Sequence, residues 1–273
     1  MTSIASSLRQ LDQLADRIRL HRQLRPDPIV IVEGPTDKLV LKEHIVASQI
    51  FPASNKNCVL ATLVTLSEWG DRGAIGIVDT DFDDPSKLED FADQLYPYNS
   101  RDLEAMLIEL GTLAMVLEHQ GSEQKLARFG GAEKLIQLLI DAVASVTALR
   151  YANARNNWGL AFDKVKLADK FDRNTLQLKV ENYCAAISRA SESDADTKSI
   201  YEAALSDAPD DLGPRGRDVL EAAGVALRKV AGSLKVESTS ESVLTSQLHS
   251  SAGLALSRSD WLIGLKDRLH SLQ

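Results

Sequence analysis

Three short apolar runs in the first third of the chain constrain its fold most. They span residues 29–32, 59–66 and 74–78, and each is rich in β-branched side chains. Runs of this length that are apolar at almost every position are typical of strands buried on both faces, as in parallel sheets. We therefore predict an α/β fold in which three strands form a mostly parallel sheet flanked by helices.

Helical patterns surround these runs. Between the first two, Thr36 predicts an N-cap and Asp37 a favourable first-turn charge, so a helix and a right-handed crossover are expected. Residues 4–24 predict an amphipathic helix that Pro26 and Pro28 end. Further helices are expected over residues 101–110, 112–119 and 131–149.

The same patterns divide the chain into three segments. Residues 1–27 predict an N-terminal helix, residues 28–120 the sheet-bearing core, and residues 121–273 a mainly helical region. The predicted helical region can return to the core near residues 213–220.

Composition indicates the broad class of protein. The chain has 273 residues, of which 44% are apolar, enough for a sizeable buried core. No apolar stretch approaches the roughly 20 residues that cross a bilayer, and the first residues lack the pattern of an export signal. Two cysteines, Cys58 and Cys184, are too few for a disulfide framework and lack zinc-binding spacing. We expect a reduced, cytoplasmic protein that does not contact membranes.

Charge is distributed unevenly along the chain. The net charge of −8 argues against a uniformly basic surface that coats DNA. Residues 79–109 hold ten acidic side chains against Lys87 and Arg101, whereas residues 124–189 hold eleven Lys and Arg against six Asp and Glu. This asymmetry suits an acidic cation site beside a phosphate-binding surface. Solvated helix faces give the same pattern, so charge alone leaves both interpretations open.

Three carboxylates follow the ends of two predicted strands. Glu33 comes directly after Val32, and Asp79 directly after Val78, with Asp81 two residues further on. In a parallel sheet these strand ends meet at one edge, where ligands commonly bind. Oxygen ligands favour Mg²⁺ or Mn²⁺ over zinc, so the pattern predicts a cation site. Each residue taken singly is also typical of a helix cap or a turn.

The two strand-end motifs together resemble a known domain. Val-Glu-Gly-Pro-Thr-Asp at residues 32–37 and Val-Asp-Thr-Asp-Phe-Asp-Asp at residues 78–84 resemble the Toprim domain of topoisomerases, primases and overcoming-lysogenisation-defect nucleases. Residues 98–107, Tyr-Asn-Ser-Arg-Asp-Leu-Glu-Ala-Met-Leu, narrow the resemblance to a Toprim-like effector family found beside ABC-type ATPases in bacterial defence loci, including the PARIS anti-phage system. Residues 160–164 and 215–220 are weakly similar to the same family.

The resemblance implies an activity and a set of roles. Asp79 and Asp81 would hold Mg²⁺ or Mn²⁺, and Glu33 would act as general acid/base or as a further metal ligand. Asp102 and Glu104 would complete a second metal position, in the manner of two-metal nucleases. The implied protein is a metal-dependent endonuclease that cleaves DNA or RNA, including tRNA, as the toxic effector of a defence system controlled by a separate ABC-type or SMC-like ATPase.

Three basic residues are candidates for contacts with substrate phosphates: Lys38, Arg72 and Arg101. No Walker A or Gly-rich dinucleotide motif is present, so no nucleotide cofactor is expected. Two other functions stay open. One is a haloacid-dehalogenase-like phosphatase, in which the Asp-x-Asp pair would supply nucleophile and acid. The other is a catalytically degenerate Toprim subunit that binds the ATPase. Homodimerisation through C-terminal helices is a further expectation.

Overall fold

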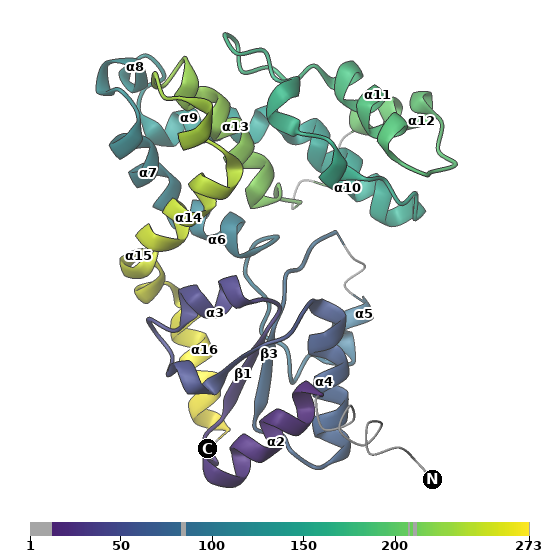
Figure 1. Cartoon of the computed structure of the whole chain (residues 1–273), viewed down its shortest axis with the longest axis vertical. Helices are drawn as coiled ribbons and strands as arrows, with labels where there is room; N and C mark the ends of the chain where they lie inside the picture. Colours follow the sequence, from purple (N-terminus) through teal and green to yellow (C-terminus); the bar gives the residue numbers. More distant parts are fainter. Residues whose placement is uncertain (1–12, 83–85, 207, 210–211, 273) are drawn as a thin grey trace. The chain divides into compact units, whose positions relative to one another are not determined.

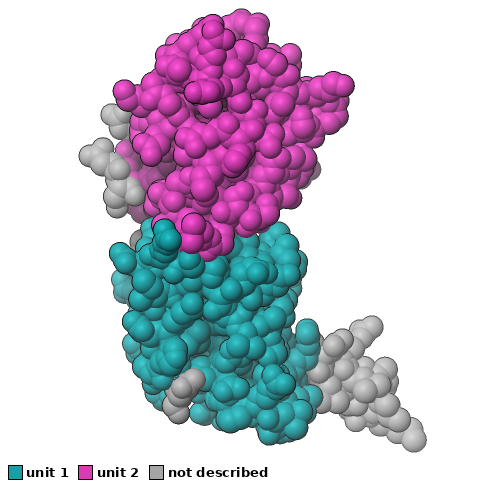
Figure 2. Space-filling model, turned by 90° about the vertical axis from the view of Figure 1, so that its left-hand side faces the viewer, with its two compact units in different colours: residues 1–80, 85–99, 256–273 teal, residues 81–84, 100–255 magenta. Residues whose placement is uncertain are grey.

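The computed structural model describes residues 13–82, 86–206, 208–209 and 212–272. Two compact units make up the chain, one of residues 1–80, 85–99 and 256–273, the other of residues 81–84 and 100–255 (Figure 2). The first unit contains the strands and the elements that flank them: α2 (Leu14–Leu24), β1 (Ile29–Val32), α3 (Pro35–Leu41), η1 (Ala47–Gln49), β2 (Ile50–Pro52), α4 (Lys56–Glu68), β3 (Ala74–Ile77), α5 (Ser86–Glu89) and α16 (Asp260–Ser271).

The sheet has three parallel strands in the order β2-β1-β3. Val32 pairs with Pro52 on one side and with Ile77 on the other, so all three carboxyl ends lie at the same edge. The predicted α/β class and the parallel sheet flanked by helices are thereby confirmed.

The second predicted strand is wrong, because residues 59–66 lie in helix α4. Asn55 caps this helix by accepting a hydrogen bond of 3.0 Å from the Cys58 backbone N–H. Val59, Leu63 and Leu66, spaced four and three residues apart, are buried, which is the period of one helical face. The neighbour of β1 is instead the three-residue strand β2, too short for its apolar pattern to be distinctive.

The helix predicted after the first strand is present as α3, but it begins earlier than expected. Gly34 is its N-cap and Pro35 occupies the first helical position, so the prediction of Thr36 as N-cap is wrong. Proline suits this position because the first helical N–H groups have no intrahelical partner. Of the predicted N-terminal helix, α2 covers the described part and ends at Leu24, before Pro26; residues 1–12 lie outside the described residues.

Helices cover both faces of the sheet. Figure 1 shows α3 and α16 on one side of the strands and α4 on the other. On the α4 side, Ile18 of α2 and Leu63 of α4 pack with Ile29 and Ile31 of β1 in a buried cluster. Gly76 of β3 permits this packing, since a Cβ there would lie 2.9 Å from the Leu63 side chain.

Helix α16 returns the C-terminal segment to the first unit through Trp261, which is 2% exposed. The Trp261 indole N–H donates to the Pro97 carbonyl at 2.8 Å, and the Tyr96 hydroxyl donates to the Trp261 carbonyl at 3.1 Å. The Trp261 ring also packs on Tyr98, with ring centroids 5.2 Å apart. The last strand of the sheet is thus followed by a loop that a distant segment holds in place.

The second unit is helical. It contains α6 (Leu103–Glu109), α7 (Thr112–Gln120), α8 (Glu123–Ala127), α9 (Ala132–Ala142), α10 (Ala144–Asn156), η2 (Phe162–Lys164), η3 (Leu167–Lys170), α11 (Val180–Ala190), α12 (Thr197–Ala204), α13 (Gly216–Arg228), η4 (Val236–Ser238) and α14 (Glu241–Ser251). The short helix α15 (Gly253–Ser257) spans the boundary between the units. Helix α13 is the centre of this unit, because it packs against α6, α7, α9, η3 and α14.

The units divide the chain at other points than the predicted segments 1–27, 28–120 and 121–273. Helix α2 packs into the first unit, α6 and α7 belong to the second, and residues 256–273 return to the first. The segment 213–220, where a return was predicted, begins α13 of the second unit. The physical reason is that apolar helix faces reveal burial and do not reveal which core they enter.

In the described ranges, no single helix has the length and apolar composition needed to cross a membrane. Helices α9 and α10 meet that criterion only as a pair, across a bend of 43°.

Candidate functional site at the carboxyl edge of the sheet

Two of the predicted site residues meet at the carboxyl edge of β1 and β3. The Asp79 backbone N–H donates a hydrogen bond of 2.8 Å to Glu33 Oε1, across 46 residues of sequence. The pairing of Val32 with Ile77 is the cause, because it brings the residues that follow each strand side by side. Both Glu33 and Asp79 are partly exposed, so their carboxylates lie where water and a ligand can reach them.

A second pair of residues supports this edge and was not identified from the sequence as part of it. The Tyr98 hydroxyl donates to Asp37 Oδ1 at 2.7 Å, and the Gly34 N–H donates to Asp37 Oδ2 at 3.1 Å. Tyr98 is 1% exposed. Asp37 therefore fixes the turn that carries Glu33. Its place in the Glu-Gly-Pro-Thr-Asp motif was a usable signal, whereas nothing in the sequence pairs Tyr98 with it.

Asp81 adopts a backbone conformation that few residues other than glycine tolerate, with φ at +46°. Two contacts within the second unit hold this conformation. The Asp81 N–H donates to the Arg101 carbonyl at 3.2 Å, and the Arg101 guanidinium donates to the Asp81 carbonyl. The guanidinium also lies over the Phe82 ring, 5.6 Å from its centroid. Such strained conformations concentrate at functional sites, and here the contacts of Arg101 favour a positioning role over direct phosphate binding.

Asp102 is 2% exposed and serves as the N-cap of α6. Its Oδ1 accepts hydrogen bonds from the Ala105 N–H at 2.7 Å and from the Gly216 N–H at 3.1 Å. Arg215 lies 3.7 Å from Oδ2. Burial, with the nearby charge of Glu104 adding to it, raises the pKa of Asp102 to about 6. Through these contacts, the Asp102 carboxylate joins α6 to α13.

Glu104 is also buried, and its Oε1 lies 3.6 Å from Arg217 Nε and 3.3 Å from His249 Nε2. His249 Nε2 makes no hydrogen bond of good geometry with a partner in the described chain. Desolvation alone would raise the pKa of Glu104, but His249 and Arg217 outweigh it, so the pKa lies below the ordinary value. The assignment of Asp102 and Glu104 to a second metal position stays a prediction. The contacts that they make join α6 to the start of α13.

The segment Arg215–Asp218 connects these carboxylates to the rest of the second unit. Each residue of the segment has an acidic or basic partner or a carboxylate acceptor: Arg215 and the Gly216 N–H with Asp102, Arg217 with Glu104, and Asp218 with Arg150. The last pair is bidentate, with N–O distances of 2.7 and 2.8 Å. The Arg150 guanidinium also lies 4.3 Å from the centroid of the Phe162 ring. The two weakly family-like stretches of the sequence, 160–164 and 215–220, therefore meet through Arg150.

The remaining predicted phosphate contacts occupy different surroundings. The Lys38 ammonium donates to the Ile50 carbonyl at 2.8 Å and so ties α3 to β2. Arg72 precedes the amino end of β3, whereas Asp79 follows its carboxyl end. The two residues therefore lie beyond opposite ends of β3. The assignment of Arg72 as a phosphate contact stays a prediction.

The donor set at the sheet edge suits a hard divalent cation. Within the described residues, no three His, Cys, Asp or Glu side chains gather closely enough to hold a metal ion by themselves. Mg²⁺ is commonly bound through one or two carboxylates, with water and substrate phosphates as the other ligands. Glu33 and Asp79, which are both partly exposed, fit that mode of binding.

Comparisons with known proteins found no similar family or structure: no family model, curated protein or solved structure matches this chain.

Proposed function

We propose that this protein is a metal-dependent nuclease with a Toprim-type site, in which Glu33 and Asp79 bind Mg²⁺ or Mn²⁺ for cleavage of a phosphodiester bond. The role of Asp81 as a further ligand rests on the resemblance alone. The observation that carries the proposal is the 2.8 Å hydrogen bond from the Asp79 N–H to the Glu33 carboxylate. It links two strand-end acids, 46 positions apart, at the edge of a parallel sheet where ligands characteristically bind.

The roles follow from the surroundings of each side chain. When bound, a divalent cation would orient a water molecule and stabilise negative charge on the attacked phosphate. Glu33 is a partly exposed carboxylate at the strand end, so it is the proposed group that accepts or returns a proton at the reacting water. Arg101 holds the backbone of Asp81, and Asp37 holds the turn after Glu33. Both are positioning residues.

From the same sequence resemblance, we propose that the protein is the toxic effector of an anti-phage system. A separate ABC-type ATPase would restrain or release it. DNA and RNA, including tRNA, are both proposed substrates. An acidic protein with a localised rather than uniform basic surface suits a substrate recognised by its shape.

The decisive experiment incubates the purified chain with plasmid DNA and total tRNA in Mg²⁺. We expect cleavage of at least one substrate, abolition by a chelator, and a rate at least about 100-fold lower for Glu33→Gln, which retains an oxygen to accept the Asp79 N–H but loses the charge and the proton-transfer function. Glu43→Gln is the matched control, because Glu43 is an exposed carboxylate of the same unit. Equal cleavage by wild type and Glu33→Gln would refute the proposal.

A cellular experiment separates catalysis from the role of a binding subunit. Induced expression of the wild-type chain with its ATPase is expected to stop growth during phage infection, whereas Asp79→Asn is expected to abolish this effect at equal protein level. If cells with Asp79→Asn still stop growing during infection as the wild type does, the protein is a subunit that acts by binding alone.

A further inference from the structure

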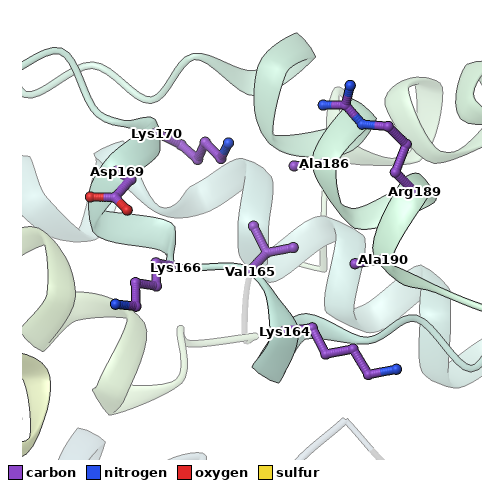
Figure 3. Close-up of a pocket in the computed structure, with 8 residues that line it drawn as sticks. All are labelled: Lys164, Val165, Lys166, Asp169, Lys170, Ala186, Arg189 and Ala190. Atoms are coloured by element: carbon purple, nitrogen blue, oxygen red, sulfur yellow. The ribbon is translucent and has the colours of Figure 1, made fainter.

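An open groove in the second unit is lined by four basic side chains. None of its lining residues is one of the candidate site residues described above. Its volume is about 520 Å³, and Lys164, Lys166, Lys170 and Arg189 line it together with one carboxylate, Asp169. The groove lies among η2, η3 and α11 (Figure 3). All four lie within residues 124–189, the segment in which Lys and Arg outnumber Asp and Glu by eleven to six.

The four cations have no anionic partner within the described part of the chain. Every ion pair of the second unit that involves a described basic residue is made elsewhere, such as Arg150 with Asp218 and Lys198 with Glu202. Figure 3 shows the Lys170 and Arg189 side chains extending toward one another above Ala186, while the Asp169 carboxylate is directed away from Ala186. Four cations and one carboxylate leave the groove with an excess of positive charge, and a bound anion would offset that excess.

The walls of the groove are fixed by hydrogen bonds. The Ala161 N–H, just before η2, donates to Ser191 Oγ at 2.8 Å, which ties η2 to the end of α11. The Lys179 N–H donates to the Lys170 carbonyl at 2.9 Å, which ties the end of η3 to the start of α11. The Ala168 N–H donates to Glu221 of α13 at 2.8 Å. The cations therefore project from a pre-organised frame rather than from a loose loop.

The lining indicates which part of a ligand is recognised. It contains no aromatic side chain on which a base could stack and no glycine-rich turn of the kind that cradles a nucleotide's phosphates. Lysine and arginine contact phosphate oxygens irrespective of sequence. Small side chains at Ala186 and Ala190 leave the floor open for a strand to lie across it.

We propose that this basic groove binds the phosphodiester backbone of a nucleic-acid strand, with Lys170 and Arg189 as the principal contacts and Lys164 and Lys166 as flanking ones. Binding at this groove does not require the nuclease activity proposed for the sheet edge, and the two proposals can fail separately.

The test measures fluorescence anisotropy of a labelled 12-nucleotide single-stranded RNA titrated with the full chain, in chelator so that no cleavage occurs. On a single strand, each phosphate contact contributes about 0.7 to the slope of log affinity against log salt. We expect Lys170→Gln/Arg189→Gln to bind about tenfold more weakly than wild type at low salt, with a slope smaller by about 1.4.

Lys134→Gln/Arg173→Gln is the matched control, because both residues are exposed, belong to the same unit and remove the same charge outside the groove. We expect it to bind within about twofold of wild type. Lys170→Arg/Arg189→Lys, which keeps both charges, is expected to retain binding. Unfolding temperatures measured in parallel exclude a loss of fold as the cause.

Three outcomes would overturn the proposal. Wild type could fail to bind the strand at low salt, or both double Gln variants could weaken binding equally, which would indicate overall charge. Alternatively, micromolar ATP could displace the strand, and Lys170→Gln/Arg189→Gln could fail to bind ATP. That result would identify a free nucleotide as the ligand.

Discussion

Asp102 shows how one buried acid controls the stability of the second unit. Its carboxylate accepts backbone hydrogen bonds from both α6 and α13, yet burial and the adjacent Glu104 raise its pKa to about 6 from 3.8. Folding therefore disfavours the ionised form of Asp102 relative to its protonated form.

We predict that this residue makes stability fall as the pH rises from about 4 to 6. The folded chain binds the proton more tightly than the unfolded chain in this window, so the unfolding free energy decreases with pH there and levels off above it. The rise of the Asp102 pKa from 3.8 to about 6 corresponds to about 3 kcal/mol of unfolding free energy. Chemical denaturation at several pH values measures the effect as the difference between wild type and Asp102→Asn.

Asp102→Asn keeps an oxygen that can accept the Ala105 N–H, so this variant is expected to fold and to lack that component of the pH dependence. Glu104 and Arg215 interact with the Asp102 charge, so their electrostatic effect on Asp102 is part of the difference that Asp102→Asn removes. An identical pH profile for wild type and Asp102→Asn would contradict the prediction.

At the scale of elements, the contact between α6 and α13 depends on a glycine. A Cβ on Gly216 would lie within 2.6 Å of the Glu104 carbonyl carbon and Cβ, so the two helix starts can touch only because this side chain is absent. The same approach brings the Gly216 N–H to Asp102.

We predict that Gly216→Ala destabilises the protein by about 2 kcal/mol or more, because backbone atoms rather than a flexible side chain must move. Gly253→Ala is the matched control. Gly253 also begins a helix, but nothing lies within 4 Å of the added methyl group, so alanine is expected to be neutral or to stabilise by up to about 1 kcal/mol. Urea denaturation measures both, and similar values for the two variants would show that the close helix contact is not required.

At the scale of the whole molecule, the first unit is built from three separate stretches of the chain. Helix α16, the last of these, anchors the segment after β3 through Trp261, whose indole and carbonyl groups bond to Pro97 and Tyr96. Tyr98, two residues beyond Tyr96, then reaches Asp37 beside the candidate site. The last helix of the chain thus supports the edge that carries Glu33.

We predict that Trp261→Ala destabilises the first unit by about 3–5 kcal/mol, the usual range for deleting a large buried aromatic side chain. Hydrogen exchange followed by mass spectrometry is expected to show faster exchange in β1 and β3, with α13 still protected. Unchanged exchange in both strands would show that α16 is dispensable for the sheet.

How far the sequence predicted these features depends on the range of the interactions involved. Apolar runs and the spacing of turn residues are local, and they correctly indicated β1, β3, α3, α6 and α7, whereas the single helix predicted over residues 131–149 is divided into α9 and α10. The run at 59–66 was assigned to a strand because uniform apolarity hid its helical period. The burial of Val59, Leu63 and Leu66, with Ala61 exposed, shows that period in the structure.

The sequence by itself determined that Glu33 and Asp79 follow strands, because a carboxylate directly after a buried run is a local pattern. Only the tertiary structure decided that the Asp79 N–H bonds to Glu33, that Asp102 and Glu104 are enclosed between α6, α13 and α14, and that four cations line one groove. These outcomes depend on strand register and helix packing. Such contacts join residues far apart in the chain, and no local pattern specifies them.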